Sequence, residues 1–132
     1  MKTEDIYPER PILIVDDEEE ALDSFEVSLC SNGISNILTC SDSRQVMTQL
    51  KQQQFSAVML DLAMPHSAGD QLLREITCDF PELPVIIITG FNEVARAVDC
   101  MRHGAFDYIV KPVEGSRLSS GVSRALEFSE LR

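Results

Sequence analysis

The sequence has little of what a secreted, membrane-spanning or nucleic-acid-binding protein needs. No apolar run approaches the roughly 20 residues of a membrane-spanning helix, and the polar residues 1–10 lack the apolar stretch of a secretory signal. Basic residues are scarce: 11 Lys and Arg stand against 22 Asp and Glu, which gives 11 − 22 = −11. This charge opposes contact with nucleic acid or an anionic membrane by this domain itself. We therefore expect a cytoplasmic protein that suits a basic partner or a bound cation.

Paired cysteines are missing as well. The four cysteines, which show no CxxC spacing and no pairing with histidine, are Cys30, Cys40, Cys78 and Cys100. Each lies in or beside an apolar segment, so we expect buried or half-buried thiols rather than a metal or redox centre. Internal repeats, low-complexity tracts and linkers are also lacking. The 132 residues, 44% of them hydrophobic, therefore predict one compact domain over residues 1–132.

What the sequence does contain is a regular alternation of short β-branched runs and segments with helical periodicity. The five predicted strands are residues 11–15, 36–40, 57–60, 85–88 and 106–110. The first, third and fourth are almost wholly apolar, as strands covered on both faces are. Five strand–helix repeats in this length predict an α/β fold, in which a doubly wound five-stranded parallel sheet carries helices on both faces.

Between the strands, apolar residues recur at helical spacing and predict the inward faces of five helices. These faces are Leu22, Phe25 and Leu29; Val46 and Leu50; Leu72, Leu73 and Ile76; Val94, Val98 and Met101; and Leu118, Val122 and Leu126. Ser43 and Asn92 are the predicted N-caps of the second and fourth helices. Gly33 and Gly104 are predicted to end the first and fourth helices, and the third must end before Pro81.

Polar residues follow four of the predicted strands, at the point where each strand ends. Asp16 and Asp17 follow the first strand, Asp61 the third, Thr89 the fourth and Lys111 the fifth. In open α/β sheets, ligands bind at the carboxyl ends of the strands. Crowded carboxylates repel one another unless a cation bridges them, and a hard ion such as Mg²⁺, or Mn²⁺ in its place, prefers oxygen ligands. The sequence therefore predicts a divalent-metal site at this edge.

A carboxylate in such a site can attack a phosphoryl group and become an acyl phosphate. Lys111 can neutralise the added charge, and the Thr89 hydroxyl can donate to a phosphoryl oxygen. Each feature alone has a simpler explanation. Residues 16–20 suit the acidic first turn of a helix, and an aspartate after an apolar strand is more often a cap than a nucleophile. Their joint occurrence at the ends of different strands favours the chemical interpretation.

Over nearly its whole length the sequence resembles the receiver domain of two-component response regulators. The matching pieces are ILIVDDE at 12–18, VMLDLAMP at 58–65, Gly69, ITG at 88–90 and GAFDYIVKP at 104–112. Thr89 lies 89 − 61 = 28 residues after Asp61, and Lys111 lies 111 − 61 = 50 residues after it, which fits the family. The resemblance implies a flavodoxin-like (βα)5 fold with strand order 2-1-3-4-5.

The resemblance also implies a role for each matching residue. Asp61 resembles the phosphoacceptor and Asp17 the direct metal ligand, while Asp16 acts beside it, often through water. Asp61 and the backbone carbonyl of Ala63 complete the protein's share of the metal sphere. The implied protein is not an enzyme in the ordinary sense, since it assists only its own phosphorylation and dephosphorylation. His66 lies close enough in sequence to affect the lifetime of the phosphoryl group.

Three further residues match positions with known roles in the family, and two of them, Thr89 and Tyr108, resemble its switch. Thr89 resembles the switch hydroxyl and Lys111 the phosphate-binding lysine, and the Lys111–Pro112 bond is expected to be cis. Tyr108 matches the aromatic residue that rotates between exposed and buried positions, although a half-buried strand tyrosine would look the same. The face expected to report phosphorylation is formed by the fourth helix, fifth strand and fifth helix, at about residues 92–128.

Residues 89–108 resemble receivers of the nitrogen-regulation class, which precede an ATPase and a DNA-binding domain in sigma-54-dependent activators. Arg96 departs from the small or acidic residue expected there, and no Walker motif (GxxxxGK) occurs. The implied partners are a sensor histidine kinase, an output domain after residue 132 and a second copy docked through the reporting face. The alternatives are a stand-alone phosphorelay carrier, a binding module that never accepts phosphate and an aspartyl-nucleophile phosphatase-like enzyme. That last class usually has an aspartate at the position of Ala63.

Overall fold

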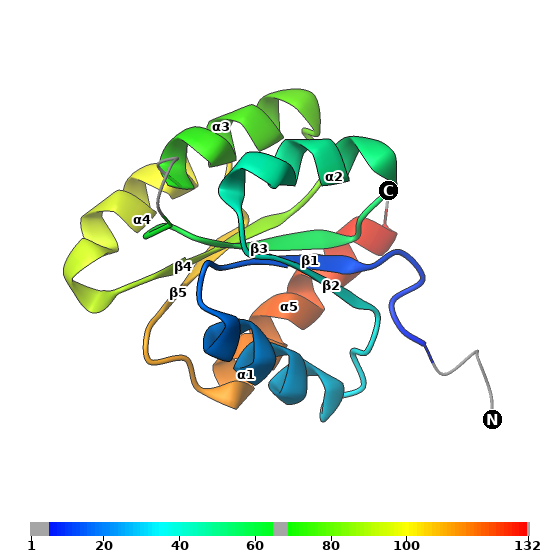
Figure 1. Ribbon diagram of the computed structural model, residues 1–132. Helices are drawn as coiled ribbons and strands as arrows, with labels where there is room; N and C mark the ends of the chain where they lie inside the picture. The colour runs from blue at the N-terminus through cyan, green and yellow to red at the C-terminus, as the bar shows by residue number, and fades with distance from the viewer. Residues whose placement is uncertain (1–5, 65–68, 132) are drawn as a thin grey trace.

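The chain forms a five-stranded parallel sheet in a computed structural model that describes residues 6–64 and 69–131. The strands are β1 (Ile12–Val15), β2 (Ile37–Cys40), β3 (Ala57–Asp61), β4 (Val85–Thr89) and β5 (Asp107–Val110). They pair in the order β2-β1-β3-β4-β5 (Figure 1). The predicted sheet and its strand order are therefore confirmed. No helix within the described ranges is long and apolar enough to cross a membrane.

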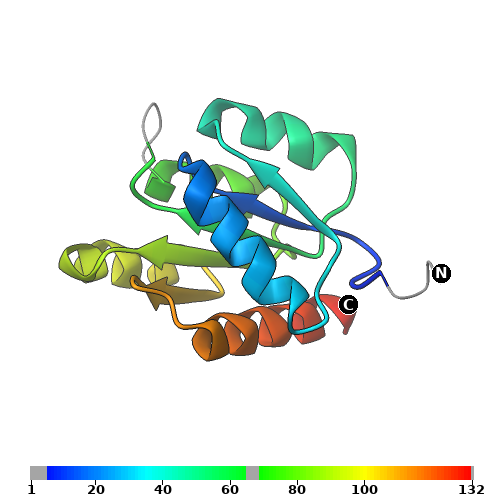
Figure 2. The same ribbon diagram turned by 60° about the horizontal axis from the view of Figure 1, so that its bottom comes forward.

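Helices cover both faces of the sheet. The five α-helices are α1 (Glu19–Cys30), α2 (Val46–Gln52), α3 (Gly69–Asp79), α4 (Val94–Arg102) and α5 (Gly115–Glu130). Two short 3-10 helices, η2 (Ser43–Gln45) and η3 (Phe91–Glu93), precede α2 and α4. Figures 1 and 2 show α1 and α5 side by side under one face, with α2, α3 and α4 over the other.

Strand β1 explains why the central strands are apolar along their whole length. Its four side chains are all buried, but they alternate between two cores. Ile12 and Ile14 pack with α1 and α5, whereas Leu13 and Val15 pack on the side of α2, α3 and α4. Since successive side chains of a strand point to opposite faces, a sheet with two covered faces requires apolar residues at every position.

The predicted inward face of α4 is wrong. The buried residues of this helix are Ala97 and Cys100, whereas the side chains of Val98 and Met101 are 41% and 37% exposed. Val94 is half-buried. The prediction followed the helical spacing of the larger apolar residues. Small residues allow a helix to lie close to a sheet, however, and the larger apolar side chains Val98 and Met101 are left facing solvent.

The predicted N-caps of α2 and α4 are also wrong, because a 3-10 helix precedes each of these two helices. Asp42 takes the place expected of Ser43, with its carboxylate accepting a hydrogen bond from the Arg44 N–H at 2.9 Å. Asn92 lies inside η3 rather than at the start of α4. The predicted helix ends are confirmed, since Gly33 and Gly104 have φ angles of 85° and 106°.

The cysteines are only partly as predicted. Cys40 and Cys100 are buried, as expected, and burial raises the pKa of both thiols. Cys30 and Cys78 are exposed, because each lies near the end of a helix on its outer side. All four are free thiols.

Candidate functional site

Three aspartates meet where β1 and β3 end. Asp61 is the last residue of β3, and Asp16 follows β1, with its N–H donating to the Cys40 carbonyl of β2. Oxygen atoms of Asp16, Asp17 and Asp61 all lie within 4.8 Å of one another. Asp16 and Asp61 are 1% and 3% exposed, while Asp17 faces solvent. The parallel strands thus bring these three predicted residues together.

Asp61 is held by one backbone group and one cation. Its Oδ1 accepts a hydrogen bond from the Ala63 N–H at 3.2 Å, and its Oδ2 lies 3.5 Å from Lys111 Nζ. Lys111 is fixed at the end of β5, because its N–H donates to the Thr89 carbonyl at 2.7 Å. The Lys111–Pro112 peptide bond is cis, as predicted. One carboxylate oxygen of Asp61 therefore has an ammonium group beside it.

Asp16 has an oxygen atom without a partner. Its Oδ1 accepts from the Glu18 N–H at 3.0 Å, but its buried Oδ2 has no hydrogen-bond partner among the described residues. Burial raises the pKa of Asp16 from 3.8 to about 6, and the charge of Asp61 adds to this effect. A buried, unpaired carboxylate oxygen beside two further carboxylates suits a hard divalent cation. The residues present therefore fit the predicted metal.

The cost of burying Asp16 leads to a testable prediction. An acid whose pKa is higher in the folded than in the unfolded state opposes folding when ionised, so its cost is absent below about pH 4 and fully present above about pH 6. We expect Asp16→Asn to raise the free energy of unfolding by about 1–2 kcal/mol at pH 7.5 without metal. Urea denaturation in a chelator measures this.

The exposed neighbour Asp17 provides the control for that experiment. Asp17→Asn should change the stability of the metal-free protein by no more than about 0.5 kcal/mol. Both variants should lose most of the stabilisation that Mg²⁺ gives the wild type, since each removes an oxygen ligand. An Asp16→Asn protein that is less stable than the wild type without metal would contradict the prediction.

The hydrogen-bond partners of the Thr89 hydroxyl are backbone carbonyls. Thr89 is buried, and its hydroxyl donates to the carbonyls of Gly90 and Glu93, both at 3.3 Å. These distances are long for hydroxyl donors, so the bonds are weak. Tyr108 is half-buried against the core on the side of α2, α3 and α4. His66, the residue expected to affect the lifetime of the phosphoryl group, lies outside the described residues.

Arg96 is a residue whose role at the site was not predicted. From α4 its guanidinium reaches the Leu62 carbonyl at 3.3 Å, the Glu93 carboxylate at 3.3 Å and the Asp70 carboxylate at 3.4 Å. Burial acts to raise the pKa of Asp70, but the hydrogen bond and charge of Arg96 outweigh it and the pKa is lowered. Leu62 follows Asp61 directly, so α4 contacts the loop that leaves the acidic site. The only signal in the sequence was the unexpected arginine.

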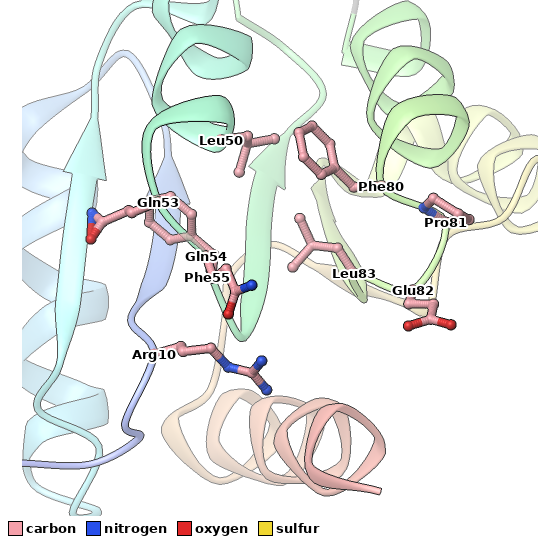
Figure 3. Close-up of a pocket in the computed structure, with 9 residues that line it drawn as sticks. All are labelled: Arg10, Leu50, Gln53, Gln54, Phe55, Phe80, Pro81, Glu82 and Leu83. Carbon is pink, nitrogen blue, oxygen red and sulfur yellow. The ribbon is translucent and has the colours of Figure 1, made fainter. Parts of the chain in front are cut away.

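A separate pocket lies at the opposite edge of the sheet. Its volume is about 350 Å³, and its lining includes Leu50, Phe55, Phe80 and Leu83, which point toward one another in Figure 3. These residues lie in or after the ends of α2 and α3, on the side where β3 and β4 begin. It is therefore remote from the three aspartates and takes no part in their chemistry.

The fold and the acidic site together define a known class of domain. Residues 12–123 match the model of the response regulator receiver domain, and the chain belongs to that family.

Two curated relatives illustrate the likeness. It is 32% identical over 115 residues to the transcriptional regulatory protein ZraR of Escherichia coli K12, and 35% identical over 120 residues to the C4-dicarboxylate transport transcriptional regulatory protein DctD of Pseudomonas aeruginosa. These matches cover 87% and 91% of this chain but 26% of each relative. The chain thus spans about a quarter of their length.

Solved structures agree with this assignment. The response regulator receiver domain protein of Clostridium thermocellum superposes with a TM-score of 0.86 at 32% identity, covering 92% of this chain and 98% of that one. The receiver domain of NtrX from Brucella abortus gives 0.83 at 36% identity, covering 88% and 98%. The predicted family is therefore confirmed.

Proposed function

We propose that this chain is a phosphoryl-accepting switch in which Asp61 takes the phosphoryl group from a sensor histidine kinase. The observation that carries the proposal is the buried Asp61 carboxylate at the end of β3, with Lys111 Nζ 3.5 Å from one oxygen and two further aspartates within 4.8 Å. Membership of the receiver family supports it. A divalent cation, Mg²⁺ or Mn²⁺, held by Asp16, Asp17, Asp61 and the Ala63 carbonyl, would neutralise charge on the phosphoryl oxygens.

The chain's own residues supply the rest of the transfer. An oxygen of Asp61 attacks the phosphorus of the phosphohistidine; a P–O bond forms as the P–N bond breaks, and the imidazole nitrogen keeps the electron pair. The Ala63 N–H orients the carboxylate through its 3.2 Å hydrogen bond. The Lys111 ammonium attracts the phosphoryl oxygens as charge develops on them. Positioning and charge stabilisation are most of what phosphoryl transfer requires.

The switch follows from the partners of Thr89. Its hydroxyl now donates weakly to Gly90 and Glu93, whereas a phosphoryl group on Asp61 would offer a stronger, charged acceptor. Because the two states then differ in their contacts, phosphorylation shifts the balance between them. Movement of Thr89 gives Tyr108 room to turn inward. The change reaches the face formed by α4, β5 and α5. Val98 and Met101 of α4 are exposed to solvent.

That face would control an attached output domain and pair with a second copy of the chain. The relatives named above are transcriptional regulatory proteins about four times as long as the matched region. We infer that the output is a transcriptional activator of the nitrogen-regulation class, which depends on the alternative sigma factor. This domain itself makes no contact with nucleic acid in the proposal, which agrees with its net charge of −11.

The test uses acetyl phosphate as a small phosphoryl donor and mass spectrometry as the readout. We expect the chain to gain the mass of one phosphoryl group with Mg²⁺ and none in a chelator. Beryllofluoride with Mg²⁺ should shift the amide resonances of residues 92–128 more than those of α2. A chain that neither gains mass, from acetyl phosphate or from a phosphorylated kinase, nor binds beryllofluoride would overturn the proposal.

A further inference from the structure

Arg96 joins three parts of the structure that surround the acidic site. Its guanidinium binds the Leu62 carbonyl in the loop after β3, the Asp70 carboxylate in the first turn of α3 and the Glu93 carboxylate just before α4. Helices α3 and α4 lie side by side over the same face of the sheet (Figure 1). Arg96 therefore connects α4 with the loop that follows Asp61 and with helix α3.

The contact with Leu62 fixes the peptide next to the proposed phosphoacceptor. The Leu62 N–H donates to the Ile88 carbonyl of β4 at 3.0 Å, so one side of this residue is held by the sheet. Its carbonyl is held by Arg96 at 3.3 Å. Because Leu62 lies between Asp61 and Ala63, a movement of α4 acts through Arg96 on the peptide directly beside the acidic site.

The contact with Glu93 extends the connection to the switch hydroxyl. The Glu93 carbonyl accepts from the Thr89 hydroxyl, and its carboxylate accepts from Arg96. Arg96 therefore binds one of the two residues whose carbonyls hold the Thr89 hydroxyl. These contacts belong to the conformation in which the Thr89 hydroxyl is bonded to the Gly90 and Glu93 carbonyls.

We propose that Arg96 is a positioning residue that stabilises the resting conformation of the switch and so lowers the affinity of the Asp61 site for a phosphoryl group. The inference rests on the proposed function and names the regulation of the same site. When the Thr89 hydroxyl leaves the Glu93 carbonyl, Glu93 loses a hydrogen bond and the start of α4 is less firmly held. The contacts of Arg96 with Leu62 and Asp70 oppose movement of α4 and so oppose this change. Arg96 thus reduces the fraction of the protein in the conformation that binds a phosphoryl group, and the apparent affinity of the Asp61 site falls in proportion.

The size of the effect is limited by the geometry. All three contacts are 3.3–3.4 Å long, and the Arg96 side chain is 36% exposed. Solvent-screened pairs of this kind contribute little each, but Arg96 also holds a buried backbone carbonyl. We expect Arg96→Ala to bind beryllofluoride about threefold to tenfold more tightly than the wild type at saturating Mg²⁺. Arg96→Lys should fall between the two, since an ammonium group cannot reach all three acceptors.

The matched control is Arg102→Ala, which removes the same charge from the last turn of the same helix. Arg102 is exposed, and its side chain lacks the contacts with Leu62, Asp70 and Glu93 that Arg96 makes. The affinity of the Arg102→Ala protein for beryllofluoride should stay within about 1.5-fold of that of the wild type. Asp70→Asn, which removes one partner without altering α4, should tighten binding by less than Arg96→Ala does.

Amide spectra separate a change in the switch from a general loosening of the fold. In Arg96→Ala without phosphoryl mimic, the Thr89 and Tyr108 resonances should move along the line that joins the free and beryllofluoride-bound positions of the wild type. Resonances that leave that line, or an affinity equal to or weaker than that of the wild type, would overturn the role of Arg96 and leave the proposed function standing. A wild type that does not bind beryllofluoride at all would overturn the proposed function, and the role of Arg96 with it.

Discussion

Asp61→Asn should abolish phosphoryl acceptance, with the incorporation rate falling at least about 100-fold and no stable phosphorylated product. The amide has no anionic oxygen to attack phosphorus, and no other described carboxylate combines burial at a strand end with an ammonium group 3.5 Å away. The fold should survive, since the amide oxygen can still accept from the Ala63 N–H. Stability should change by no more than about 1 kcal/mol, because lost attraction to Lys111 is offset by relief of repulsion among the aspartates.

The control is Asp79→Asn, the same substitution at the exposed end of α3. It should accept the phosphoryl group at the wild-type rate. Mass spectrometry after incubation with acetyl phosphate and Mg²⁺ reads out both proteins, and circular dichroism checks their folding. A mass gain that persists in folded Asp61→Asn would mean that another residue is the acceptor.

Much of the fold was predictable because its strands are covered on both faces. Ile12 to Val15 are apolar throughout and divide between two cores, so a continuous apolar run was a reliable sign of a central strand. Helix α4 was the failure, since Val98 and Met101 face solvent while Ala97 and Cys100 face the sheet. Side-chain size misleads wherever close packing of a helix requires small residues, and the sequence of the helix alone does not say how closely it packs.

The acidic cluster was predictable for a different reason. Parallel strands end at a common edge, and since β1 pairs with β3, residues at the ends of these two strands are neighbours, as Asp16 and Asp61 are. The unpaired Oδ2 of Asp16 and the direction of the Thr89 hydroxyl were not predictable. Both depend on side-chain rotamers, which a sequence pattern does not specify even where the partners lie within four positions. The contacts of Arg96 were not predictable for another reason, since they join residues up to 34 positions apart.

Gly69, the first residue of α3, lies against the loop that leaves the acidic site. A Cβ atom at this position would lie 2.7 Å from Leu62 Cα and 3.1 Å from the Asp61 carbonyl oxygen. Both are backbone atoms, and the Leu62 backbone is held by hydrogen bonds to Ile88 and Arg96, so it resists displacement. An alanine here must therefore displace the start of α3 or the peptide beside Asp61.

Gly69→Ala is thus expected to lower the free energy of unfolding by about 2–3 kcal/mol, although replacing glycine with alanine in a helix normally stabilises it by about 0.5–1 kcal/mol. Gly121→Ala in α5 is the matched control. The three atoms nearest to its Cβ would all be side-chain atoms, Arg117 Nη1 at 3.0 Å and two others at 3.5 Å, so its net effect should stay within about 1 kcal/mol. Urea denaturation measures the free energy of unfolding of both variants. Equal values would contradict the prediction and show that the loop after β3 moves to accommodate the added methyl group. Gly69→Ala should also slow phosphorylation by acetyl phosphate in the fraction that remains folded, whereas Gly121→Ala should not, because only the former moves the backbone that carries Asp61.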